Sequence, residues 1–151
     1  MKKFSGLDEF VAAQGSQLGP TDWLEVTQER VNLFADATDD HQWIHVDPER
    51  AAEGPFGTTI AHGFLTLSLC APLLGKALAG LTSSGMSINY GTNKVRFPAP
   101  VPVGSRIRAR ITIASVEDVP GAEQMVAVTT IEREGGEKPV CVAELVIRRY
   151  A

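Results

Sequence analysis

The residues best suited to chemistry lie in one stretch of the chain, residues 34–66. It contains all three histidines of the sequence, His41, His45 and His62. Asp40 stands five positions before His45. A carboxylate and an imidazole that face one cavity can form an acid and base pair, because an imidazole has a pKa of about 6.5 and exchanges protons at neutral pH. Such a pair can position and deprotonate a water molecule, although the same two residues could also serve as a turn cap and a packing histidine.

Gly63 begins the most hydrophobic run of the sequence, residues 63–78. If this run is a helix, the Gly63 N–H is one of the unpaired donors of its first turn, at the positive end of the helix dipole. Such an amide can bind a developing oxyanion, and removal of one donor of this kind typically costs about 3 kcal/mol of transition-state stabilisation. A glycine at a helix start is also common without any function. The candidate catalytic residues are therefore Asp40, His45 and Gly63.

Local signals in the first half of the chain place these candidates between two helices. Residues 7–13 have the spacing of a short amphipathic helix, and residues 23–26 that of a brief strand. Thr27 can cap a helix that ends near Thr38. After it we expect a long irregular connection with a helical turn over residues 49–53, so that the acid and the imidazole lie on a loop.

The second half of the chain predicts the scaffold. Residues 63–78 are apolar on nearly every side, as in a helix buried all round, and Pro72 could kink it. Apolar and polar side chains then alternate as in antiparallel strands over residues 88–97, 105–113, 124–133 and 139–149. We expect an α+β fold in which an antiparallel β-sheet wraps around one central buried helix. Four long strands and one helix leave an edge or a flank uncovered, which favours a dimer.

Composition limits the class of protein. The 151 residues, 44% hydrophobic and 21% charged, fit one globular domain over residues 1–151. The net charge of -4 argues against a general nucleic-acid binder. The first residues lack the apolar core of a secretory signal, and the longest apolar run is too short to cross a bilayer. Cys70 and Cys141 lie in apolar segments, as reduced core thiols do, so we expect a cytoplasmic protein.

Two motifs, in this order and spacing, resemble those of the MaoC-like family of (R)-specific enoyl-CoA hydratases, which have the hotdog fold. TDDHQWIHVD is similar to the family's Gly-Asp-x-Asn-Pro-Ile/Val-His, and IAHGFLTLSL to its Ala/Val-His-Gly at the start of the central helix. The stretch NKVRFPAPVPVGSRI extends the likeness over nearly the whole chain. The family glycine is Asp39 here and its Asn-Pro is Gln42-Trp43, a form similar to a subgroup around the rhizobial nodulation protein N. Asp39 leaves open which acid is the base, and Trp43 could reshape the acyl tunnel.

The resemblance implies a hydro-lyase reaction, the hydration of a trans-2-enoyl-CoA to an (R)-3-hydroxyacyl-CoA. Asp40 matches the aspartate that removes a proton from the water adding at Cβ. His45 matches the histidine that holds this water and delivers a proton at Cα, and Gly63 matches the glycine whose N–H binds the thioester oxygen. It implies no metal or redox cofactor. The implied partners are an acyl-CoA or acyl-carrier thioester substrate and a second copy of this chain in a homodimer. We expect no nucleic-acid or membrane partner.

Other interpretations compete with this one. A hotdog protein could instead be an acyl-CoA thioesterase or a non-catalytic acyl-CoA-binding module. His41 and His45, with Asp47, would resemble a metal cluster if the segment were helical. The arginines within residues 106–110 could bind the phosphates of coenzyme A or simply form a solvated strand face. We expect His62 to bond backbone near the helix start rather than to act in catalysis.

Overall fold

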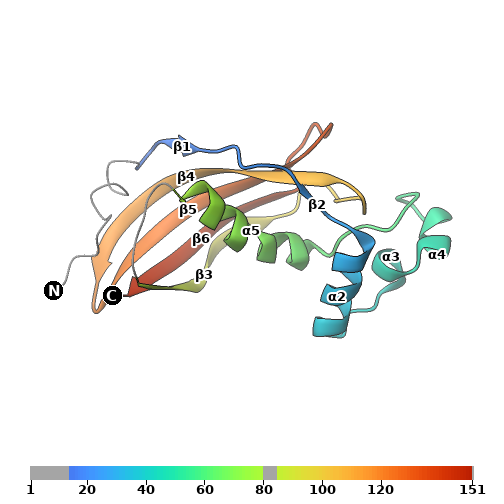
Figure 1. The fold of residues 1–151 in the computed structure, drawn as a ribbon, viewed down its shortest axis with the longest axis horizontal. Coiled ribbons are helices and arrows are strands. Elements are labelled where there is room, and N and C mark those ends of the chain that lie inside the picture. The colour runs from blue at the N-terminus through green and yellow to red at the C-terminus, as the bar shows by residue number, and fades with distance from the viewer. Residues whose placement is uncertain (1–13, 80–84, 151) are drawn as a thin grey trace.

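The computed structural model describes residues 14–79 and 85–150, and the helix expected over residues 7–13 lies outside them. In these ranges an antiparallel sheet curls around one long helix (Figure 1). This is the expected α+β arrangement, a hotdog fold. None of the helices in the described ranges is long and apolar enough to cross a membrane.

The sheet has a free edge. Its elements are β1 (Gln17–Leu18), β2 (Leu24–Glu25), β3 (Met86–Arg96), β4 (Arg106–Val119), β5 (Ala122–Arg133) and β6 (Cys141–Tyr150). The order is β1-β4-β5-β6-β3, with β2 also paired to β4, and every pairing is antiparallel. The predicted strands are therefore confirmed, although β4 is longer than expected and β1 was not foreseen. Within the described ranges, β3 pairs with β6 on one side only.

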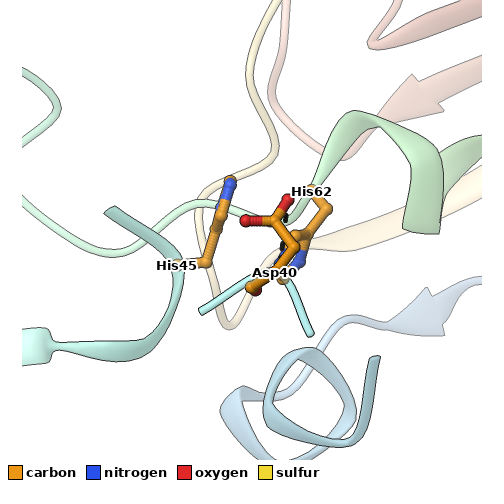
Figure 2. A group of neighbouring side chains, drawn as sticks. All are labelled: Asp40, His45 and His62. Carbon is orange, nitrogen blue, oxygen red and sulfur yellow. Dashed lines mark hydrogen bonds and ion pairs between the residues drawn. The ribbon is translucent and has the colours of Figure 1, made fainter. Parts of the chain in front are cut away.

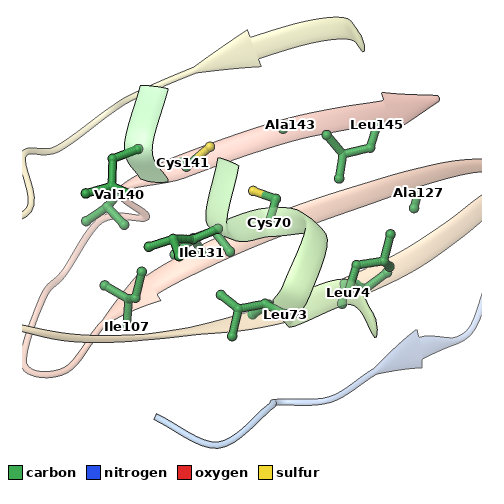
Figure 3. Packing of buried hydrophobic residues seen from close by; sticks show 14 of the residues in the cluster. Cys70, Leu73, Leu74, Ile107, Ala127, Ile131, Val140, Cys141, Ala143 and Leu145 are labelled. Atoms are coloured by element: carbon green, nitrogen blue, oxygen red, sulfur yellow. The ribbon is translucent and has the colours of Figure 1, made fainter. Parts of the chain in front are cut away.

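The core lies between the sheet and α5 (Gly63–Ala77). Side chains of β4 alternate as expected, with Ile107 and Ile111 fully buried beneath α5 and the intervening arginines on the outer face. Figure 3 shows Leu73 of α5 packed among the sheet's inner residues. Full burial of one such side chain contributes roughly 1.5–3 kcal/mol. Cys70 and Cys141 are buried free thiols within this core, as predicted.

One flank of α5 is open to solvent, so the expectation of a helix buried all round is wrong. The Phe64 side chain is 70% exposed, and Pro72 and Lys76 also lie on this open flank. The helix is continuous through Pro72. A hydrophobic run predicts that a helix surface is buried. It does not show whether the same chain or a second chain buries that surface.

Three helices lie beyond one end of the sheet, beside the N-terminal end of α5 (Figure 1). They are α2 (Gln28–Thr38), α3 (Trp43–Val46) and α4 (Pro48–Ala52). The Thr27 hydroxyl caps α2 as predicted, by accepting the Arg30 N–H. Asp39, at the position of the family glycine, ends α2 with a φ of 58°, a conformation that aspartate tolerates better than most residues. The expected helical turn over residues 49–53 is confirmed as α4, whereas α3 interrupts the connection where an irregular loop was expected.

Candidate active site

Three segments that are distant in sequence bring Asp40, His45 and His62 together. Asp40 lies in the turn after α2, His45 on α3 and His62 directly before α5, and Figure 2 shows their side chains gathered at one point. One potential ligand atom from each of the three side chains lies within 4.8 Å of those of the other two. The predicted meeting of Asp40 and His45 is therefore present in the structure. The expected loop position of His45 is wrong, since a short helix carries it.

The ring of His45 is anchored on one side. Its Nδ1–H donates to the Ile60 carbonyl at 2.7 Å, and only 7% of the residue is exposed. The Ile60 N–H donates in turn to the Ile44 carbonyl at 3.0 Å, which ties α3 to the segment before α5. Because Nδ1 carries the hydrogen, Nε2 of the neutral ring is an acceptor. Burial lowers the pKa of His45 below its ordinary value of 6.5, so the ring is neutral at pH 7.

Gln28, in the first turn of α2, holds the backbone around His45. Its Nε2–H donates to the His45 carbonyl at 2.8 Å, and its Oε1 accepts the Thr59 hydroxyl at 2.7 Å. One side chain thus joins α2, α3 and the segment that leads into α5. This role could not be predicted from the sequence, because the partners of Gln28 lie 17 and 31 positions away.

A pocket of about 350 Å³ opens beside these groups. His45, Gly63 and Thr66 lie along it, and its walls are mostly apolar: Phe56, Ile60, Ala61, Phe97, Pro98, Ala99, Pro100, Val101 and Val140. Among the described residues no acceptor is recorded for the Gly63 N–H. A Cβ at Gly63 would lie 3.2 Å from the Phe97 ring, so any larger residue here would require this ring to shift by a few tenths of an ångström. Asp40, whose side chain is 54% exposed, stands next to His45 rather than among the lining residues.

His62 is a member of the cluster that the sequence did not select. Its Nε2–H donates to the main-chain carbonyl of Asp40 at 2.9 Å, and its ring stacks on that of His45 with centroids 3.8 Å apart. The expected backbone hydrogen bond is thus present, but its acceptor lies 22 positions away rather than at the helix start. Only the AHG motif, shared with the family, could have drawn attention to it.

The cluster of Asp40, His45 and His62 has the composition of a metal site but not its geometry. The two imidazole planes are 23° from parallel, so their nitrogen lone pairs run side by side instead of converging on one ion. Tetrahedral zinc requires convergent ligands. The other metal candidate is not assembled, because His41 bonds the Asp36 carboxylate at 2.9 Å. Asp47 instead caps α4 through the Arg50 N–H.

Trp43 lies outside the pocket, so the structure does not bear out its expected effect on an acyl tunnel. Its ring packs on Gly54, where a Cβ would come within 3.0 Å of it, and beneath the Arg50 guanidinium at 4.4 Å. Gln42 precedes α3, and its side chain makes no recorded hydrogen bond within the described ranges. The two departures from the family motif therefore modify the scaffold near the site rather than the pocket wall.

The arginines of β4 also lie away from the pocket. Arg106 pairs with Glu134, and both Arg108 and Arg110 pair with Glu132. These residues face outward from the sheet, on the side opposite α5. The structure favours the interpretation of a solvated, ion-paired strand face over a phosphate site.

Comparison with known proteins identifies the family. Residues 9–135 match the model of the MaoC like domain. The chain belongs to this family. 3-Hydroxyacyl-thioester dehydratase Z of Mycobacterium tuberculosis (strain ATCC 25618 / H37Rv) is 57% identical, over 100% of both chains. Nodulation protein N of Rhizobium leguminosarum bv. viciae is 46% identical, over 85% of this chain and 81% of its own.

Solved structures agree with this assignment. The (R)-hydratase from A. caviae involved in PHA biosynthesis superposes with a TM-score of 0.72 and 27% identity, over 89% of this chain and 94% of its own. The predicted family, its likeness to nodulation protein N and the hotdog fold are confirmed. The prediction that this MaoC-like protein is an enzyme of the hydratase and dehydratase type is confirmed as well.

Proposed function

We propose that this MaoC-like protein is an (R)-specific hydratase that adds water to a trans-2-enoyl-CoA to give an (R)-3-hydroxyacyl-CoA, and catalyses the reverse dehydration. One observation carries the proposal. A carboxylate and an anchored neutral imidazole lie together beside an apolar pocket that is also lined by Gly63, the first residue of α5, whose N–H has no recorded acceptor among the described residues. The names of the M. tuberculosis and A. caviae proteins support the same class of substrate and reaction.

The geometry suggests how protons move in the forward reaction. A water molecule is held between the Asp40 carboxylate and Nε2 of His45. As its oxygen adds to Cβ, Nε2 takes its proton and the electrons of the double bond move toward the thioester oxygen. The Gly63 N–H stabilises that oxygen, and the imidazolium then gives its proton to Cα. Asp40 accepts a hydrogen bond from the water and stabilises the charged imidazole.

This scheme assigns proton removal to His45, where the sequence suggested Asp40. The reason is that Nδ1–H is fixed on Ile60 and the ring is neutral, which leaves Nε2 as an acceptor in the pocket. Asp40 is half exposed and lies at the side of His45. The scheme needs no metal or redox cofactor, because an acid, a base and an oxyanion donor suffice for the addition of water.

We also propose that the enzyme works as a homodimer joined along β3. The outer edge of β3 has no strand partner in the described ranges, and Met86, Ile88 and Tyr90 are exposed on one face of it. Phe64, on the open flank of α5, and Phe97 are further exposed apolar side chains. A free edge beside exposed apolar side chains is a surface that a second sheet can continue.

The function is tested by identifying the product. The protein is incubated with crotonyl-CoA and with longer trans-2-enoyl-CoAs while absorbance of the enoyl band, product chirality and free thiol are followed. We expect loss of the enoyl band, formation of the (R)-3-hydroxyacyl-CoA and no thiol. Release of free thiol would show a thioesterase instead, and binding without turnover over hours would show a non-catalytic acyl-CoA-binding module.

A further inference from the structure

His62 contacts each part of the proposed catalytic group. Its Nε2–H donates to the main-chain carbonyl of Asp40, and its ring lies on the ring of His45. Its own carbonyl accepts the Thr66 N–H in the first turn of α5, which fixes the helix start that presents Gly63. One residue therefore links the carboxylate, the imidazole and the amide of the site.

The turn that carries Asp40 depends on this link. The other recorded hydrogen bond to Asp40 in the described ranges runs from the nearby Gln42 N–H to Oδ1 and is long, at 3.4 Å. A bond between residues two positions apart stabilises the turn but does not fix it relative to α5. The bond from His62 fixes the turn relative to α5. With this bond in place, the Asp40 carboxylate lies 3.9 Å from the His62 ring.

Packing alone would not favour an imidazole at this position. His62 is 3% exposed and lies against the rings of His45 and Phe34, where an apolar ring would also fit. Its Nδ1 is buried with no recorded hydrogen-bond partner in the described ranges, and burial of a polar atom in that state carries a cost. The donor at Nε2 is the property that an apolar side chain would lack.

We propose that His62 is a positioning residue of the hydratase site. It fixes the main chain of Asp40 and the orientation of the His45 ring, and so sets the separation of the two groups that share the attacking water. His62 is not among the residues that line the pocket, so it acts through its neighbours. This inference rests on the proposed hydration of enoyl thioesters.

Three variants of His62 and one control variant separate the role of its Nε2–H donor from the role of its ring in packing. His62→Gln can place an amide N–H near the position of Nε2, whereas the amide of His62→Asn is too short to reach the Asp40 carbonyl. His62→Phe keeps the ring but removes the donor. His41→Gln is the matched control, because His41 is exposed and bonds Asp36 outside the site.

We expect kcat for crotonyl-CoA hydration to fall by about 10-fold to 100-fold in His62→Asn and His62→Phe, as for a misplacement on the order of 1 Å. KM should change little, since His62 does not line the pocket. The kcat of His62→Gln should be at least about tenfold higher than that of His62→Asn, and the kcat of His41→Gln should equal that of the wild type. Thermal melting shows whether each variant is folded. If His62→Phe does not fold, the comparison of His62→Gln with His62→Asn still tests the positioning role.

The pH profile supplies a readout that a merely structural role would not change. Among the described groups, the charges that act on His45 are those of His62 and Asp40, and His62 lowers the pKa of His45. Its replacement should therefore move the acid limb of kcat/KM to higher pH in His62→Gln and His62→Asn alike. The inference is overturned if the wild type hydrates crotonyl-CoA while the Gln and Asn variants have equal kcat. A wild type that does not hydrate any enoyl-CoA would overturn the proposed function itself.

Discussion

At the scale of single residues, the chemistry depends on which nitrogen of His45 is free. The carbonyl of Ile60 can only accept a hydrogen bond, so Nδ1 must donate, and Nε2 is left for the water. A ring held in this way acts as a base only while it is neutral. Burial favours the neutral form, because a charged imidazole loses its hydration there.

This assignment predicts the pH dependence of the reaction. Because burial lowers the pKa of His45 below 6.5, the acid limb of kcat/KM should be centred below pH 6.5. Stability should weaken over the same range, since below pH 6.5 the unfolded chain binds a proton at this residue before the folded one does. A pH–rate profile with enoyl-CoA checks this, and an acid limb centred above pH 6.5 would contradict it.

Gly63 provides a second prediction at this scale. In Gly63→Ala the new methyl lies 3.2 Å from the Phe97 ring and projects where the thioester must approach. We expect kcat/KM to fall by about 10-fold to 100-fold with the fold retained. Gly75→Ala on the same helix is the control: among the described residues its methyl meets nothing within 4 Å, and it should keep activity. Equal activity of the two variants would argue against an oxyanion site at Gly63.

At the scale of elements, the site is held where α2, α3 and the segment before α5 meet. Residue types and short motifs were enough to predict Asp40, His45 and Gly63 as candidates, together with the capped α2 and the alternating strands. They could not reveal His62 and Gln28 as their supports, because those contacts join residues far apart in sequence. Nor could they show that a four-residue helix carries His45, since so short an element has no periodicity.

Gln28 allows the junction itself to be tested. Gln28→Ala leaves the His45 carbonyl and the Thr59 hydroxyl without their recorded partner, so we expect a loss of about 1–3 kcal/mol in the free energy of unfolding. kcat should fall as well, because α3 loses one of its ties. Urea unfolding and steady-state kinetics measure both effects. Gln42→Ala, at an exposed position, is the control, and an equally small effect in both variants would contradict the assigned role of Gln28.

At the scale of the whole molecule, the open flank of α5 and the free edge of β3 lie on surfaces that the described chain does not cover. The apolar run of α5 indicated burial, but sequence alone could not assign that burial to the same chain or to another. The proposed dimer accounts for both uncovered surfaces at once. It also explains why β3 carries large apolar side chains at an edge, where charged residues are usual.

The dimer is tested with one added charge. Ile88→Asp places a carboxylate on the exposed apolar face of β3, so we expect sedimentation velocity to show a dimer for the wild type and a monomer for the variant. Leu33→Asp, at an exposed leucine of α2, should remain dimeric and serves as the control. A monomeric wild type, or an Ile88→Asp variant that stays dimeric, would count against association along β3.

The proposed activation of water depends on Asp40 and His45, so its sharpest test is the rate of enoyl-CoA hydration by Asp40→Asn and His45→Gln. Both changes conserve shape while removing the carboxylate charge or the basic nitrogen. We predict that each lowers kcat by about 10²-fold to 10⁴-fold, the usual contribution of a positioned acid or base, while circular dichroism stays close to that of the wild type. The melting temperature of His45→Gln should fall, because this variant loses the Nδ1–H bond to the Ile60 carbonyl. Variants that are folded and hydrate crotonyl-CoA at the wild-type rate would contradict the proposal that these two residues activate the water.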